Sequence, residues 1–251
     1  IQNFKNVVSG EISFENPKKD YKASVLGLYG QNGSGKTALI DAISLLKLLL
    51  CGLPVPVKFA DYVNVGTDCA IISYEIKIIE EDDDADNEYI ATYTVKFKKS
   101  HDDINVDLSV INDSEDKYKF DFVSESFNCA VNQNGKKTPS RKIVDTSSEY
   151  SGLFLPKKNA DIITKCDRDI YTDLIVEKKL SKVMSKSFVF SKVLIEAFEK
   201  AGENSLTVSN DSCLTAKKWA ELLNELCEYG LNNLFVVDTA NIGMINTFNA
   251  L

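Results

Sequence analysis

The residues best suited to chemistry lie in one glycine-rich stretch, residues 30–37. The stretch is Gly30-Gln31-Asn32-Gly33-Ser34-Gly35-Lys36-Thr37, which matches the phosphate-binding pattern G-x-x-x-x-G-K-[ST]. Glycines permit the tight turn that points successive N–H groups at one anion, and the helix that follows adds its positive N-terminal end. We expect Lys36 to reach the β- and γ-phosphates of a nucleotide and the Thr37 hydroxyl to bind Mg²⁺.

The flanks of this stretch fit the strand, loop and helix order that the motif requires. Residues 24–29 form a short apolar run, as expected of a buried parallel strand. After the loop, apolar residues recur at helical spacing, namely Ala38, Leu39, Ala42, Ile43, Leu46 and Leu49. A chance turn containing a lysine would not explain both flanks, so the sequence predicts a P-loop followed by a helix that Gly52 ends.

The rest of the chain separates into a strand-rich part and a helical part. Residues 1–4 and 11–14 suggest two short strands joined by a turn at Ser9-Gly10. Apolar residues then alternate with polar ones over 72–78, 88–97, 104–110 and 118–122, which predicts an antiparallel meander that extends to about Val144.

Helical character begins near Asp161. We expect one helix over 174–201 that stops at Gly202, a second over 215–229 with Thr215 as N-cap and Gly230 beyond its end, and a last strand at 234–237. The expected domains are a P-loop core over 1–66, an antiparallel β-subdomain over 67–150 and a mainly helical part over 151–251.

Composition limits the partners and the compartment. The net charge of −8 argues against a chain-wide nucleic-acid surface, although it is compatible with a local basic patch. The six cysteines form no C-x-x-C pair and the chain has one histidine, so we expect no zinc site and reduced thiols in a cytoplasmic protein. No apolar run reaches the length of a membrane span.

Two other groups of residues that could do chemistry are explained better without a metal-binding or catalytic role. The acidic run 80–86 does not fit a calcium loop, because Asn87 stands where the glycine belongs and Tyr93 where the final glutamate belongs. We therefore interpret it as a solvated hairpin tip. His101 lies in a charged turn without a nucleophile motif, which gives no support for a catalytic role.

Asp238 is a second candidate metal ligand. It follows the apolar residues 234–237, which is the shape of a Walker B strand whose aspartate holds Mg²⁺. Thr239 follows it, at the position where ABC-type ATPases place a catalytic glutamate. Any buried strand that ends in aspartate gives the same pattern, so both interpretations stay open.

The first 50 or so residues resemble a known group of proteins, the AAA/ABC-type ATPases related to SMC, RecF and OLD proteins. Three segments show the resemblance: Ile1-Gln2-Asn3-Phe4-Lys5-Asn6, Leu28-Tyr29 with the P-loop, and Ala38-Leu39-Ile40-Asp41-Ala42-Ile43. The resemblance implies an α/β P-loop NTPase fold, the head lobe of an ABC-type ATPase with an antiparallel β-subdomain and a helical C-terminal part. It also implies ATP and Mg²⁺ as ligands, and it places Lys5 and Asn6 near the adenine or ribose.

The same resemblance implies partners. Many members of the group act in bacterial anti-phage defence or in DNA transactions, with an effector such as a nuclease or toxin, and ATP lies between the heads of two subunits. A homodimer or higher oligomer is therefore expected, with no membrane and with nucleic acid not indicated by charge.

The chain also departs from the family pattern. It has no S-G-G-x signature motif and no Walker B Asp-Glu pair, and it starts without methionine. We therefore expect it to be the N-terminal lobe of a larger ATPase whose general base lies elsewhere. Two alternatives stay open: a regulatory or assembly module that binds nucleotide without hydrolysing it, and, more weakly, a sugar or nucleoside kinase, which would want an arginine-rich lid although the chain has only Arg141 and Arg168.

Overall fold

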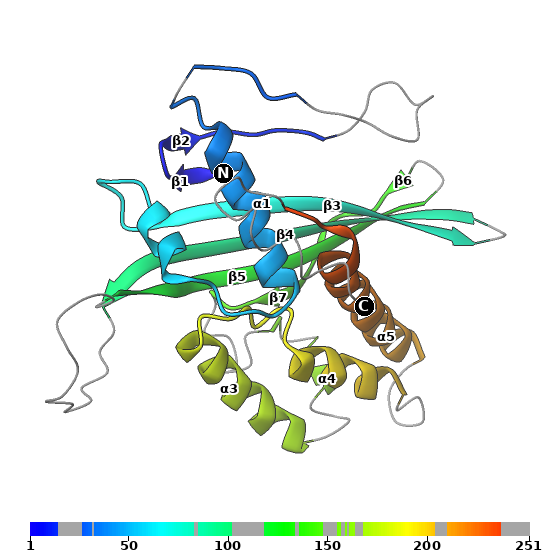
Figure 1. Ribbon diagram of the computed structural model, residues 1–251. Helices are drawn as coiled ribbons and strands as arrows, with labels where there is room; N and C mark the ends of the chain where they lie inside the picture. Colours follow the sequence, from blue (N-terminus) through cyan, green and yellow to red (C-terminus); the bar gives the residue numbers. More distant parts are fainter. Residues whose placement is uncertain are drawn as a thin grey trace, which may run out of the picture.

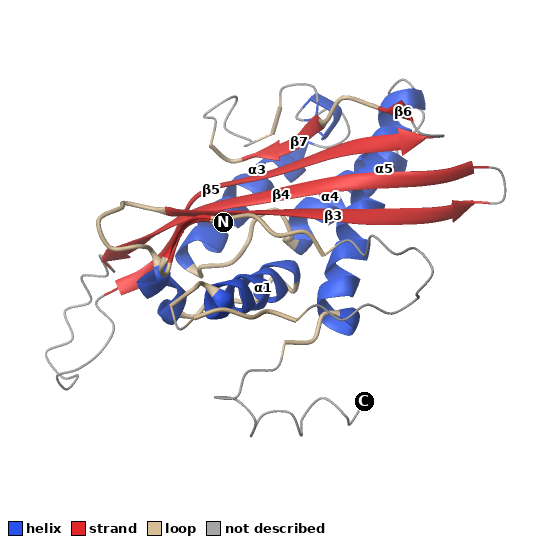
Figure 2. Ribbon diagram, turned by 90° about the horizontal axis from the view of Figure 1, so that it is seen from above, coloured by secondary structure: helices blue, strands red, loops and turns tan. Residues whose placement is uncertain are grey.

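A computed structural model of the chain describes residues 1–14, 27–31, 33–82, 85–101, 118–133, 136–147, 155–156, 159, 161–163, 168–203 and 210–236. These residues form a twisted antiparallel sheet, and helices α3, α4 and α5 lie together on one side of it (Figures 1 and 2). The predicted α/β architecture, with an antiparallel sheet and a helical C-terminal part, is confirmed at this level.

The sheet is built around three long strands. Its strands are β1 (Gln2–Phe4), β2 (Val7–Ser9), β3 (Ala70–Asp82), β4 (Ala85–His101), β5 (Tyr118–Gln133), β6 (Lys136–Lys137) and β7 (Arg141–Asp145). Their order is β2-β1-β3-β4-β5-β6, with β7 also paired to β5, and every pairing in the described part is antiparallel. The predicted meander is therefore confirmed for these strands, and the described part of the acidic run lies at the end of β3 and the start of β4, where Asp82 pairs with Ala85. The expected strand at 104–110 lies outside the described residues.

The helices differ from the sequence prediction in their boundaries. They are α1 (Lys36–Leu50), the 3₁₀-helix η1 (Val57–Tyr62), α3 (Arg168–Val183), α4 (Lys192–Glu203), α5 (Asn210–Glu228) and the π-helix η3 (Tyr229–Asn233). The single helix expected over 174–201 is wrong: Ser185 has a positive φ of 52° and ends one helix, and the Ser191 hydroxyl accepts from Leu194 N–H at 3.3 Å to start the next. Thr215 lies inside α5 rather than at its N-cap.

Three short segments also differ from the sequence prediction. The N-terminal hairpin turns at Lys5-Asn6, with Phe4 opposite Val7, and not at Ser9-Gly10. Residues 27–29 form no strand, and Tyr29 is 95% exposed, because in the described part no neighbouring strand pairs with them or covers them as a parallel strand requires. Residues 234–236 are likewise not a strand, while 24–26 and 237 lie outside the described residues.

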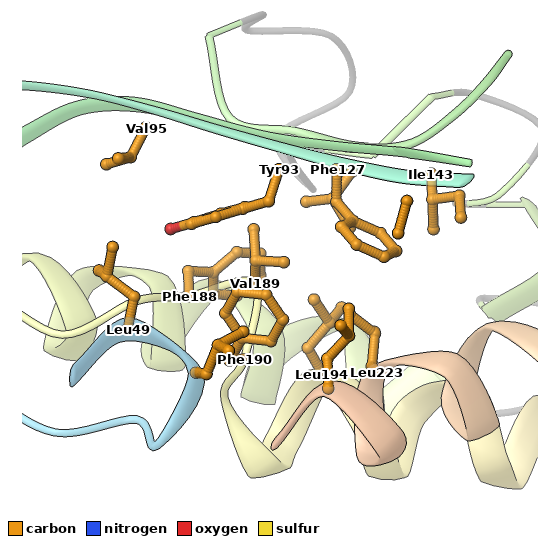
Figure 3. Packing of buried hydrophobic residues seen from close by; sticks show 14 of the residues in the cluster. Leu49, Tyr93, Val95, Phe127, Ile143, Phe188, Val189, Phe190, Leu194 and Leu223 are labelled. Atoms are coloured by element: carbon orange, nitrogen blue, oxygen red, sulfur yellow. The ribbon is translucent and has the colours of Figure 1, made fainter. Parts of the chain in front are cut away.

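The core fills the space between the sheet and the helices. Figure 3 shows Tyr93, Val95, Phe127 and Ile143 pointing from the strands toward Leu49 of α1, residues 188–190, Leu194 of α4 and Leu223 of α5. Tyr93 and Phe190 meet edge to face with ring centroids 4.9 Å apart. The α3–α4 connection is thus part of the core, and it fixes these two helices to the sheet.

A buried carboxylate ties that connection to β5. Glu125 is 1% exposed and accepts hydrogen bonds from Tyr93 Oη at 2.7 Å, Ser187 Oγ at 2.5 Å and the Phe188 backbone N–H at 3.0 Å. Lys178 Nζ of α3 lies 3.9 Å from its second oxygen. Burial lowers the pKa of Lys178, although the charge of Glu125 opposes the shift. The carboxylate therefore holds sheet, connection and helix together.

Gly202 of α4 lies close to the backbone of α5. A Cβ at this position would lie 2.9 Å from Lys217 Cα and 3.0 Å from Lys217 N, which are backbone atoms that cannot rotate away. Gly202→Ala gains at most about 1 kcal/mol of helix propensity, whereas overpacking costs about 1–3 kcal/mol. We expect a net loss of about 1–2 kcal/mol in the free energy of unfolding, measured by urea denaturation. Glu203→Ala, at the exposed end of the same helix, should change it by less than about 0.5 kcal/mol; an equal loss in both variants would contradict the packing argument.

In the part of the chain that the structure describes, we find no helix with the length and apolar character needed to cross a membrane.

Candidate phosphate-binding loop

The glycine-rich stretch leads directly into α1, as the sequence predicts. Gly35 is the N-cap of α1 and has φ +88°, a left-handed conformation that side-chain-bearing residues rarely adopt. The Leu39 N–H donates to Gly35 O at 3.1 Å, which is the first bond of the helix. No side chain caps this N-terminus and no acidic residue stands in the first turn of α1, all of which the structure describes. The helix therefore presents its positive end to the loop.

Lys36 places its ammonium group against the loop that precedes it. Its Nζ donates to Gly30 O at 2.7 Å, to Gln31 O at 2.8 Å and to Ser34 Oγ at 3.2 Å. The Ser34 backbone N–H donates to Gln31 O at 3.2 Å, and this hydrogen bond closes the turn of the loop. The positive charge and the helix N-terminus thus meet over one short stretch of backbone. Phosphate oxygens would be stronger acceptors for this ammonium than the neutral carbonyls it now contacts.

The N-terminal hairpin touches the loop at its turn. The Asn6 side-chain amide donates to the carbonyl of Gly33, and Val7 of β2 lies where a Cβ on Gly35 would meet it, at 2.9 Å. Asn6 therefore fixes the orientation of the peptide between Gly33 and Ser34. The N–H of that peptide, which belongs to Ser34, donates to Gln31 O, so the Asn6 side chain and the turn of the loop hold the same peptide.

Lys5 points away from the loop, toward α1 and η1. Its ammonium forms an ion pair with Asp41 of α1 and lies 4.1 Å from the centre of the Tyr62 ring. Its backbone N–H donates to Tyr62 O at 2.5 Å, and its carbonyl accepts from Asn64 Nδ2 at 2.7 Å. These contacts anchor the hairpin turn on the helix that follows the P-loop. That Lys5 and Asn6 lie beside an adenine or ribose stays a prediction.

Three further predicted site residues have different outcomes. Thr37 is exposed in the first turn of α1, where its hydroxyl is accessible to a hydrated Mg²⁺ ion. Asn32 and Asp238 lie outside the described residues. Among the residues that are described, no cluster of three or more His, Cys, Asp or Glu side chains could hold a metal ion. His101 is the last residue of β4 rather than part of a turn.

Comparison with known families decides the class to which this loop belongs. A family model described as "AAA domain" matches residues 1–226, which is most of the 251-residue chain. The chain belongs to the AAA domain family. Neither the search of curated proteins nor the search of solved structures returned a match.

Membership of the AAA domain family gives the loop a general role. The family consists of P-loop ATPase modules that bind nucleotide and generally take ATP with Mg²⁺. The donor set of this AAA domain fits that role, because an ammonium, an uncapped helix N-terminus and an exposed threonine hydroxyl are grouped at one loop. ATP binding at residues 30–37 is consistent with both the family and the geometry.

One partner in this AAA domain was missed at the sequence level. Asp41 lies one helical turn after Thr37 and forms an ion pair with Lys5. The contact between Lys5 and Asp41 joins residues that are 36 positions apart, which no local pattern specifies.

Asn6→Ala tests whether the hairpin positions the loop of this AAA domain. Loss of one side-chain hydrogen bond to Gly33 should weaken ATP binding by about two- to tenfold, with little change in melting temperature because the site is exposed. Calorimetric titration with Mg²⁺ and ATP measures the effect. Asn224→Ala, which removes a similar bond to Glu199 at 2.8 Å far from the loop, should leave the affinity unchanged. Equal affinities for the wild type and Asn6→Ala would refute the positioning role.

Proposed function

We propose that this AAA domain is the ATP-binding lobe of a larger ABC-type P-loop ATPase. The observation that carries the proposal is the convergence of the Lys36 ammonium and the uncapped N-terminus of α1 on the loop at residues 30–37. Both features favour a polyanion, and they are adjacent because the motif places the lysine at the first position of the helix.

Each site residue has a definite role in this proposal. Backbone N–H groups from Asn32 to Thr37 hold the phosphates, and Lys36 neutralises the charge that develops at the β–γ bridge. Thr37, together with Asp238, is assigned to Mg²⁺, which when bound neutralises phosphate charge. Lys5 and Asn6 belong to the nucleotide site through the hairpin that sets the loop's orientation. The general base lies outside this chain.

The exposure of the loop supports an assembly of two heads. Gly33, Ser34 and Thr37 are exposed, so a triphosphate bound here would face solvent. Phosphoryl transfer benefits from a site that excludes water, and a second protomer would supply the missing wall. The exposed loop therefore favours a homodimer or higher oligomer. We further propose a cytoplasmic location and a division of the chain into a P-loop core (1–66), a β-subdomain (67–150) and a mainly helical part (151–251).

The resemblance to SMC, RecF and OLD proteins supports a role in bacterial anti-phage defence or in a DNA transaction. In that role ATP would drive or gate an effector such as a nuclease or toxin. A second function remains in view: a regulatory module that closes on ATP without turnover and signals by a population shift. The absence of a Walker B glutamate after Asp238 in the sequence favours this second function for the isolated chain.

The rate of ATP hydrolysis against protein concentration separates these functions. With Mg²⁺ present, the isolated chain is expected to bind ATP and to show no turnover that Lys36→Ala removes. A rate that rises more steeply than concentration and disappears in Lys36→Ala would instead show that two copies build a complete site, and would assign Asp238 to Walker B. Absence of both binding and hydrolysis would contradict the proposal.

A further inference from the structure

Residues of α3 and α4 line a groove. Both helices lie on the helical side of the sheet, away from the N-terminal end of α1 (Figure 1). It has a volume of about 220 Å³ and is lined by Ile170, Asp173, Val176, Glu177, Val193, Glu196, Ala197 and Lys200. The α4 residues recur at i, i+3, i+4 and i+7, so one face of that helix forms a complete wall. Half of these lining residues are apolar and the other half are charged.

An exposed apolar stripe on α3 continues from this groove. Val176 and Leu180 are each 48% exposed, and beyond them Val183 is 66% and Met184 49% exposed. Their spacing of i, i+4, i+7 and i+8 places them along one flank of the helical axis. Single exposed apolar residues are ordinary, but four in register with a groove form a continuous binding surface.

Two lysines and two carboxylates of α3 point in different directions, while Lys179 is exposed and does not line the groove. Lys178 and Lys182 face the sheet, where their ammonium groups lie 3.9 Å from Glu125 and 3.8 Å from Asp121. The other flank carries Asp173 and Glu177 into the groove, and Glu196 faces them from α4. Three carboxylates and one ammonium, that of Lys200, therefore line the groove.

The contacts of these carboxylates leave the groove acidic. Glu177 accepts a hydrogen bond from Ser181 Oγ at 3.2 Å, which does not neutralise its charge. Glu196 lies 3.5 Å from Lys192, whose side chain is 89% exposed, and such pairs are weak in water. No lysine or arginine of α3 stands three or four positions from Asp173 or Glu177, so the helix itself offers these carboxylates no basic partner at that spacing.

The size of the groove selects among ligand types. Small-molecule pockets commonly span about 300–1,000 Å³, and this groove is smaller and shares Val176 with the apolar stripe. Its volume suits one large side chain from a protein partner, with further contacts along α3. Recognition of this kind places the apolar face of a helix in a groove through residues at i, i+3 or i+4, and i+7.

We propose that the α3–α4 groove docks an amphipathic helix of a partner protein. That helix carries an apolar anchor residue for the groove and lysine or arginine residues beside it. Its apolar face covers Val176, Leu180 and Val183, and its basic residues pair with Asp173, Glu177 and Glu196. The site is separate from the P-loop and would let the ATPase module engage its effector or a regulator without covering the nucleotide.

Fluorescence anisotropy with a designed peptide tests this proposal. The probe is a labelled 18-residue helix of leucine on one face and lysine on the other, titrated with the 251-residue chain at about 0.15 M salt. We expect saturable binding that is at least tenfold weaker for a peptide with glutamate in place of lysine. A scrambled lysine–leucine peptide, with equal charge but no apolar face, should also bind at least tenfold more weakly.

Matched variants locate the binding. Glu177→Lys with Glu196→Lys should lower the affinity at least tenfold, and so should Val176→Asp, which changes a half-exposed side chain and leaves the core intact. The control pair Glu75→Lys with Glu228→Lys makes the same change in net charge at exposed positions on β3 and α5. Circular dichroism melting confirms that each variant is folded.

The result that overturns the proposal is equally specific. An equal loss of affinity in the control pair would mean that the peptide senses only net charge. Binding of the scrambled peptide with full affinity, or no saturable binding of the designed peptide, would show that the groove is not a helix-docking site.

Discussion

Lys36→Ala is expected to weaken ATP binding by about 10- to 100-fold, which corresponds to about 1.4–2.8 kcal/mol. The reason is the position of the ammonium, which lies over the loop with three contacts to Gly30, Gln31 and Ser34. Charge-assisted bonds to phosphate are among the strongest that a side chain makes, and alanine removes all of them. Calorimetric titration of Mg²⁺ and ATP into each protein measures the loss, and ATP-dependent activity of the complete enzyme should disappear with it.

Two controls make this result specific to the charge at the loop. Lys36→Met keeps most of the side chain but not its charge, and should bind ATP as weakly as Lys36→Ala. Lys136→Ala removes an exposed lysine from β6, far from α1, and should bind like the wild type. Unchanged ATP affinity in Lys36→Ala would count decisively against the assignment of residues 30–37 as the phosphate site.

Glu125→Ala is expected to cause the largest loss of stability, about 3–5 kcal/mol in the free energy of unfolding. The substitution strands four groups in the core: the Tyr93 and Ser187 hydroxyls, the Phe188 N–H and the ammonium of Lys178. A buried charge without its partner costs far more than the lost contact alone. For a chain of this size the melting temperature should fall by about 6–20 °C.

Two further variants separate charge burial from other causes. Glu125→Ala with Lys178→Met removes both charges, so it should recover part of the stability lost in Glu125→Ala. Glu88→Ala breaks a partly exposed pair with Lys77 at 3.7 Å and a hydrogen bond from Asn132 Nδ2 at 2.8 Å on the same sheet, and should cost less than about 2 kcal/mol. Equal losses at Glu88 and Glu125 would contradict the account of the buried network.

The helix that follows the glycine-rich loop, and its start at Lys36, were predictable because their signals are local. Gly35, Lys36 and Thr37 and the helical spacing from Ala38 to Leu49 fix a turn, a helix start and a buried face within fifteen residues of helix. The expected strand before the loop was not found at 27–29, because a strand exists only when another strand pairs with it. Sequence patterns record apolar runs but not the presence of that partner.

The N-terminal hairpin shows a second limit of sequence reasoning. The prediction placed the turn at Ser9-Gly10, since serine and glycine are usual turn residues. The chain instead puts Asn3 and Lys5 at φ 54° and 53°, and the turn falls at Lys5-Asn6. The cost of this backbone is offset by the ion pair with Asp41 and the contact with Tyr62, both from distant parts of the sequence.

The buried network on β5 could not have been found from the alternation of residues alone. Phe120 and Phe122 point into the core, and the same alternation would place Glu125 on the opposite face. A bulge, at which Lys96 pairs with Ser124 and Phe97 with Phe122, shifts the register so that Glu125 lies on the buried side. A carboxylate in that register requires buried donors, and the serines between α3 and α4 supply one of them. Sequence could not provide the identity of those donors either, because Ser187 lies 62 positions away.

The measurement that tests the central claim most directly is the location of ATP by nuclear magnetic resonance. Mg²⁺ and ATP are added to isotope-labelled protein, and the backbone amide signals are followed. The largest shifts are expected at Gly33, Ser34, Gly35 and Lys36 and in the first turn of α1, with none at the α3–α4 groove. Shifts that leave the loop unchanged, or that cluster on another surface, would contradict the assignment of this AAA domain as an ATP-binding module.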